Sequence, residues 1–182
     1  MSTPITSSEQ DLRYPVGRFK PPDNITAADT ASWLRDIEAL PANLRHAVAD
    51  LNDAQLDTPY RPGGWTVRQV VHHLPDSHMN SYSRFRLALT EDSPTIKPYD
   101  EAAWAELVDA KTAPIEPSLA LLESLHARWT ILLGSLTETD LARTFRHPEL
   151  GKVRLDWTLG SYAWHSRHHV AHITNLRRRE SW

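Results

Sequence analysis

The sequence predicts an all-α protein with the architecture of a four-helix bundle. Apolar residues recur at helical spacing in four long segments, and the connections between those segments are short. The chain of 182 residues is 40% hydrophobic and 24% charged, which is typical of one soluble domain with its own core. We expect residues 1–24 to form an extended N-terminal arm and residues 25–182 to form the bundle. The alternative for the first 24 residues is a disordered tail.

The four segments contain residues that favour helix starts or bends. Pro41 interrupts the first segment and either kinks one helix or begins a second one. Thr66 and Asp156 are candidate N-caps of the second and fourth segments. Pro75 lies inside the second segment, where we expect it to bend the helix beside His73. The expected helical segments are 26–52, 66–90, 117–136 and 156–180.

Shorter elements are expected between the long segments. Residues 100–110 predict a short helix, and Thr137 can start another helical turn. Residues 145–155 combine strand-forming residues with Pro148 and Gly151, so we expect a small hairpin or an irregular insertion before the last helix. Two proline-bearing stretches are expected to be loops: 53–64 and 91–98.

Composition and charge exclude several functional classes. The formal net charge of −3 gives no electrostatic reason to expect binding to nucleic acid or to an anionic membrane. No apolar stretch approaches the ~20 residues of a membrane span, and the N-terminus lacks the pattern of a signal peptide. The chain has no cysteine, which excludes disulfides, thiolate ligands and a cysteine nucleophile. We therefore expect a cytoplasmic protein in which any metal is bound by histidine or carboxylate side chains.

Histidine is the most informative residue type in this chain. The two clusters it forms lie on the second and fourth predicted helices, so they can face each other across the core. Three neutral imidazoles that converge on one point form a metal site. Seven of the ten histidines belong to these clusters: His72, His73 and His78, then His165, His168, His169 and His172.

The second cluster offers two ligand pairs, because residues four apart share one face of a helix. The pair His165/His169 is the better inward-facing choice, since apolar side chains frame its sector, but His168/His172 has the same spacing. On the second helix, His73 lies on a polar face that is directed toward the core. Polar groups in such a position are costly unless they bind something.

A metal held by three histidines keeps a coordination position open, which is typical of a catalytic site. Such a metal can activate water or a thiol for attack on an electrophilic small molecule. Asp76 and His172 are candidate proton carriers, and Trp164 is a candidate substrate-binding wall of the pocket. His126 is expected at a partly exposed position, and His147 in a loop. The alternative function is a non-catalytic metal-binding module of a stress response, in which the metal only joins two helices.

Four motifs of the chain carry a resemblance to a known family: YPVGRF (14–19), RPGGWTVRQVVHHLPDSHMNSY (61–82), KPYDE (97–101) and YAWHSRHHVAHI (162–173). They closely resemble the YfiT-type branch of the DinB superfamily. The resemblance covers nearly the whole chain from about residue 12 and implies a DinB four-helix bundle that forms a homodimer. It also implies one divalent metal, zinc or nickel, per subunit, with His73, His165 and His169 as ligands. Pro75 departs from the pattern, in which a small residue such as alanine is expected.

The resemblance also implies an activity, that of a metal-dependent hydrolase. Related DinB proteins are metal-dependent thiol S-transferases that use bacillithiol, mycothiol or glutathione, and the YfiT type looks like the bacillithiol branch. The expected partners are therefore an electrophilic small molecule and a low-molecular-weight thiol. A chain without cysteine suits a thiol cosubstrate, because no protein thiol competes for the metal, but water would serve equally well as the nucleophile.

Overall fold

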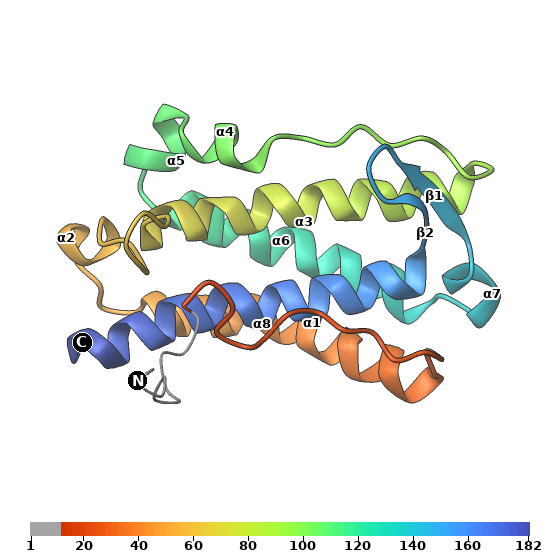
Figure 1. The fold of residues 1–182 in the computed structure, drawn as a ribbon, viewed down its shortest axis with the longest axis horizontal. Coiled ribbons are helices and arrows are strands. Elements are labelled where there is room, and N and C mark those ends of the chain that lie inside the picture. Colours follow the sequence, from red (N-terminus) through yellow and green to blue (C-terminus); the bar gives the residue numbers. More distant parts are fainter. Residues whose placement is uncertain (1–11) are drawn as a thin grey trace, which may run out of the picture.

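The computed structural model describes residues 12–182 and confirms the four-helix bundle (Figure 1). Helix α1 packs along α8 and α6, and α3 packs against α6 and α8. The last helix, α8, therefore lies between α1 and α3, and it is the longest of the four. The bundle helices are α1 (Ala27–Val48), α3 (Val67–Thr90), α6 (Glu116–Gly134) and α8 (Leu155–Glu180).

Of the two predicted N-caps, the one at Thr66 is confirmed and the one at Asp156 is not. The side chain of Thr66 accepts a hydrogen bond from the backbone N–H of Gln69, and the side-chain oxygen of Gln69 accepts one from the backbone N–H of Thr66. This capping box confirms the predicted N-cap of α3. The predicted cap at Asp156 is wrong. Helix α8 begins one residue earlier, and the Asp156 carboxylate instead binds the guanidinium of Arg154 and the N–H of Trp157 within the first turn.

The connections contain more short helices than expected. The stretch predicted as a loop at 53–64 contains a helical turn, and the short helix predicted at 100–110 is divided in two. The predicted hairpin before the last helix is confirmed, with Phe145 opposite Val153 in an antiparallel pair. These elements are α2 (Asp53–Leu56), α4 (Glu101–Ala105), α5 (Val108–Thr112), α7 (Glu138–Leu141), β1 (Thr144–His147) and β2 (Gly151–Arg154).

Two clusters of buried apolar residues fill the bundle, and histidines lie where they meet. The first cluster includes Leu74 of α3 and Ile173 of α8, and the second includes Phe85 of α3 and Leu159 of α8. On α6 the same boundary falls at His126. The histidines of three helices therefore occupy one layer between two apolar regions, where an imidazolium ion would be poorly solvated.

Residues 12–24 lie along the bundle without helix or strand (Figure 1). The ring of Phe19 packs edge-on against Trp157 at 5.5 Å between centroids, and the carbonyl of Gly17 accepts a 2.9 Å hydrogen bond from Trp164 Nε1. The expected arm also includes residues 1–11, which lie outside the described part of the chain, so its boundary at residue 24 stays a prediction. Among residues 12–182, no helix combines the length and apolar character needed to cross a membrane.

Candidate metal centre

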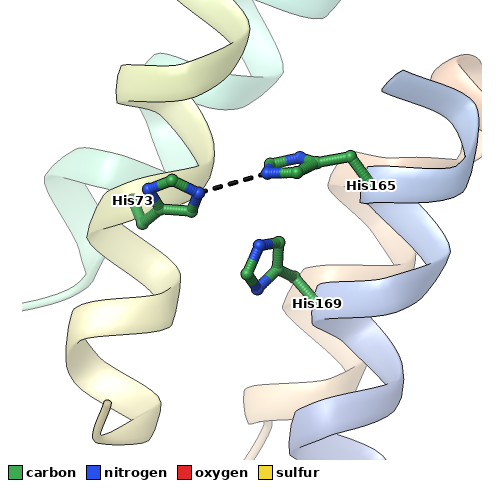
Figure 2. A group of neighbouring side chains, drawn as sticks. All are labelled: His73, His165 and His169. Atoms are coloured by element: carbon green, nitrogen blue, oxygen red, sulfur yellow. Dashed lines mark hydrogen bonds between the residues drawn. The ribbon is translucent and has the colours of Figure 1, made fainter. Parts of the chain in front are cut away.

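Three histidines from two facing helices converge on one point in the bundle. His73 comes from α3, and His165 and His169 lie one turn apart on α8 with their rings directed toward α3 (Figure 2). The Nε2 atoms of His73 and His165 are 3.1 Å apart. One nitrogen from each of the three rings lies within 4.8 Å of the other two. The structure thus brings together the three residues that the sequence predicts as metal ligands, which we call the histidine triad.

Burial keeps the triad neutral at physiological pH. It lowers the pKa of His73 to about 4 and holds the pKa values of His165 and His169 well below the ordinary value of 6.5. The cause is poor solvation of an imidazolium ion in this layer, to which repulsion between neighbouring histidines adds. A neutral imidazole keeps a lone pair available, which is the form that binds a metal.

The geometry of the triad fits a divalent metal with nitrogen ligands. Tetrahedral coordination at about 2.0–2.1 Å from each nitrogen places two ligand nitrogens roughly 3.4 Å apart. The observed 3.1 Å between His73 and His165 is close to that separation. The Nδ1 atom of His169 is buried without a hydrogen-bond partner among the described residues, so this nitrogen is not committed to another contact.

The triad lines a cleft of about 990 Å³. Trp65 and Tyr162 contribute aromatic walls beside it, and the Trp65 ring lies 4.7 Å from that of His73. Within residues 12–182, no carboxylate and no fourth histidine joins the triad at ligand distance. A metal bound there therefore keeps coordination positions for an exogenous ligand. The cleft lining also contains charged residues of both signs: Arg61, Arg84, Asp100, Glu101 and Glu149.

A second group of histidines lies next to the triad and shares one member with it. His168, His169 and His172 are all buried, and one nitrogen from each lies within 4.8 Å of the others. The ring of His168 stacks on Trp164 at 4.4 Å, and that of His172 stacks on Tyr60 at 3.9 Å. The two outer rings are thus packed against aromatic walls on α8 and the α2–α3 connection, whereas the triad joins α8 to α3.

Of the three other predicted site residues, two line the cleft and one does not. Trp164 and His172 line it. Asp76 does not line it. Burial, with a smaller contribution from Asp109, raises the pKa of Asp76 to about 6, so this carboxyl is suited to proton exchange but is not placed beside the triad. The structure therefore brings two of these three residues together with the triad.

The prediction for His126 is wrong. This residue is 2% exposed, and its Nε2 lies 3.0 Å from Nδ1 of His78, which in turn places its Nε2 3.3 Å from Nδ1 of His165. The sequence did contain a signal, because residue 126 falls at helical spacing between the buried Leu122 and Trp129. His147, predicted in a loop, is the last residue of β1 and lines the cleft.

The metal-free protein is expected to lose stability as the pH falls from 6.5 to 4. Burial lowers the pKa of His73, His126 and His168 to about 4, so the unfolded chain binds more protons than the folded chain in this window. Each extra proton taken up by the unfolded chain lowers the free energy of unfolding by about 1.4 kcal/mol per pH unit. Asp76, with its raised pKa, opposes this trend below pH 6 but is a single group. Urea unfolding at several pH values measures the slope, and a flat or rising free energy toward pH 4.5 would contradict the buried neutral histidines.

Comparison with known proteins places the chain in a family. The family model described as the DinB superfamily matches residues 36–173. A protein from Bacillus cereus named "Putative metal-dependent hydrolase" is 59% identical over 94% of this chain and 99% of its own length. A protein from Bacillus mycoides is also named "Putative metal-dependent hydrolase". It is 58% identical over 95% of this chain and 99% of its own length.

Solved structures agree with that placement. YfiT from Bacillus subtilis, described as a probable metal-dependent hydrolase with an unusual four-helix bundle topology, superposes with a TM-score of 0.91. It is 55% identical, over 94% of this chain and 99% of that one. The four-helix bundle protein TT2238 is 21% identical with a TM-score of 0.53, which supports the fold alone. The chain therefore belongs to the DinB superfamily, in its YfiT-type branch.

Proposed function

We propose that this protein is a metal-dependent hydrolase in which His73, His165 and His169 hold one Zn²⁺ or Ni²⁺ ion. The observation that carries the proposal is the convergence of three neutral imidazoles at a cleft, without a fourth ligand from residues 12–182. The names of the Bacillus relatives support the same activity. When bound, such an ion supplies Lewis acidity that lowers the pKa of a water or thiol ligand.

The residues around the triad prepare the cleft for a small electrophile. Trp65 and Tyr162 give one side of the site an aromatic surface, and the Tyr162 hydroxyl donates a 3.2 Å hydrogen bond to the carbonyl of Ser77. We propose Trp164 as a substrate wall, because its indole is fixed by the carbonyl of Gly17. We propose His172 as the proton acceptor. Burial lowers its pKa to about 3, so the ring is unprotonated at rest.

A second candidate function, thiol S-transfer, is supported by the size of the cleft. Pockets that hold one small molecule occupy about 300–1,000 Å³, and this cleft lies at the upper end of that range with about 990 Å³. We propose that a cleft of this volume accommodates a thiol cosubstrate beside a small electrophile. Because the chain has no cysteine, no protein thiol competes with such a cosubstrate for the metal.

One assay separates the two nucleophiles. Metal-loaded protein is incubated with monobromobimane, with and without bacillithiol, and both conjugation and hydrolysis of the bromide are followed. A hydrolase is expected to release product at a rate independent of the thiol, whereas a transferase is expected to form conjugate only when thiol is present. The His165→Ala variant is the control, because it removes a triad residue and leaves the cleft walls in place. Equal rates for this variant and the unaltered protein would contradict both functions.

The non-catalytic alternative makes a different prediction about the metal. A structural site is normally closed by four protein ligands. X-ray absorption spectroscopy of metal-loaded protein is therefore expected to find three imidazoles and at least one exogenous oxygen, and a fourth protein ligand would favour the structural role.

The expected homodimer and cytoplasmic location stay predictions. Light scattering of purified protein measures the oligomeric state.

A further inference from the structure

A chain of hydrogen bonds runs from the backbone of α1 to the triad. Nδ1 of His126 lies 2.7 Å from the carbonyl oxygen of Ile37. Nε2 of His126 lies 3.0 Å from Nδ1 of His78, and Nε2 of His78 lies 3.3 Å from Nδ1 of His165. The path therefore crosses from α1 through α6 and α3 to α8. His78 and His126 are 0% and 2% exposed, so water does not compete for these contacts.

The hydrogen bond between His126 and the carbonyl of Ile37 can run in only one direction. A carbonyl oxygen can only accept, so Nδ1 of His126 must carry a proton. Pro41 explains why this carbonyl is available. A helical carbonyl normally accepts from the N–H four residues later, and for Ile37 that residue is Pro41, which has no N–H. His126 supplies the donor that the α1 helix lacks at this position.

The direction of every other hydrogen bond follows from the first. His126 is neutral, so its Nε2 has no proton and must accept from Nδ1–H of His78. The same rule leaves Nε2 of His78 as an acceptor for Nδ1–H of His165. His165 then carries its single proton on Nδ1, and its Nε2 is left with a lone pair. Nε2 is also the atom that faces His73 in the triad.

We propose that His78 and His126 are positioning residues that fix His165 as its Nδ1–H tautomer and thereby direct the Nε2 lone pair toward the metal. This inference rests on the proposed metal site and names the part of the fold that prepares it. Residues that hold a ligating histidine through its other ring nitrogen orient the ring and raise its basicity, and their loss typically weakens metal binding about 10–100-fold. Here a buried pair of histidines and one freed helix carbonyl perform that role.

Burial cost distinguishes this role from simple packing. Leucine at positions 78 and 126 would fill an apolar layer between Leu122 and Phe85 without requiring any partner. Instead, both nitrogens of each ring are paired, whereas the described structure leaves Nδ1 of His168, His169 and His172 without partners. The paired rings are thus oriented by hydrogen bonds on both sides, and they end at one nitrogen of the triad.

The first test reads the tautomers directly in the metal-free protein. Nitrogen-15 NMR of histidine-labelled protein at neutral pH distinguishes a ring protonated at Nδ1 from one protonated at Nε2. We expect the Nδ1–H tautomer for His126, His78 and His165. The Nε2–H tautomer at His165 would overturn the proposal. This measurement needs no bound metal, so it decides the tautomer even if the triad proves not to bind one.

The second test links the path to metal affinity by Zn²⁺ titration. His126→Phe removes the acceptor of His78, and we expect mixed tautomers at His165 and about 10–100-fold weaker Zn²⁺ binding. His126→Gln keeps an oxygen that can accept from His78, and we expect it to restore the tautomer and most of the affinity. His72→Phe is the matched control, because His72 is a buried α3 histidine that is hydrogen-bonded to Ser118 outside this path.

The outcomes separate the two proposals. Unchanged affinity and tautomer in a folded His126→Phe variant would overturn the positioning role. Equal losses in His126→Phe and His72→Phe would also overturn it, because they would reflect general destabilisation. Retention of Zn²⁺ by His73→Ala would instead overturn the proposed metal site and leave the tautomer result intact. If His126→Phe does not fold, the tautomers of the unaltered protein decide.

Discussion

Replacing His165 with alanine is expected to strip most of the metal from the protein, and His73→Ala and His169→Ala are expected to do the same. Each change leaves two imidazoles in a buried layer that offers no carboxylate at ligand distance within residues 12–182. Loss of a residue that only orients a ligand costs about 10–100-fold in affinity, so loss of a ligand itself should exceed about 100-fold. Elemental analysis of purified variants and competitive Zn²⁺ titration measure the effect.

His168→Ala is the matched control for this prediction. It removes a buried histidine of the same helix that belongs to the second group and not to the triad. We expect this variant to keep its metal at full stoichiometry. The reverse pattern, in which His168→Ala loses metal and His165→Ala keeps it, would show that the ligand pair is His168/His172. Circular dichroism confirms that each variant is folded before its metal content is compared.

Much of the fold can be predicted from the sequence because local signals and the apolar pattern agree. The capping box at Thr66, the apolar stripe of α6 and the proline and glycine of the hairpin each specify their element locally. Asp156 shows where a local signal fails. Its side chain is a good N-cap in isolation, but the neighbouring Arg154 guanidinium binds both carboxylate oxygens and the helix begins one residue earlier.

The candidate site was predictable to the extent that it depends on helical phase. Residues His165 and His169 are one turn apart, so any helix through this segment places them on one face, and His73 needs only a facing helix. The role of His126 could not be read in this way. One of its partners is the carbonyl of Ile37, which Pro41 leaves without a helical donor, and the other is the ring of His78 on α3. Both contacts join residues that are distant in the sequence, so they depend on tertiary packing.

Replacing Trp129 with alanine is expected to have the largest effect on stability. This side chain is fully buried, and its ring contacts those of Phe85, His78, His126 and Tyr162 at centroid distances of 5.7–5.9 Å. Truncation of a buried tryptophan to alanine typically costs about 3–5 kcal/mol, because it leaves a cavity that the surroundings cannot close. Urea unfolding of the metal-free protein measures the loss, with an unchanged m-value as the check that the folded state stays compact.

Trp129→Phe gives a sharper test of why the tryptophan matters. The indole Nε1 is buried and has no hydrogen-bond partner among the residues that the structure describes, so phenylalanine removes an unsatisfied donor together with part of the ring. We therefore expect Trp129→Phe to cost far less than Trp129→Ala. Ile131→Ala on the same helix, at a position 75% exposed, should change the free energy of unfolding by no more than about 0.5 kcal/mol. If Trp129→Phe were as damaging as Trp129→Ala, Nε1 would have to make a contact that this packing does not contain.

Because the same ring packs against His78 and His126, the alanine variant should also weaken Zn²⁺ binding, and the phenylalanine variant should preserve it.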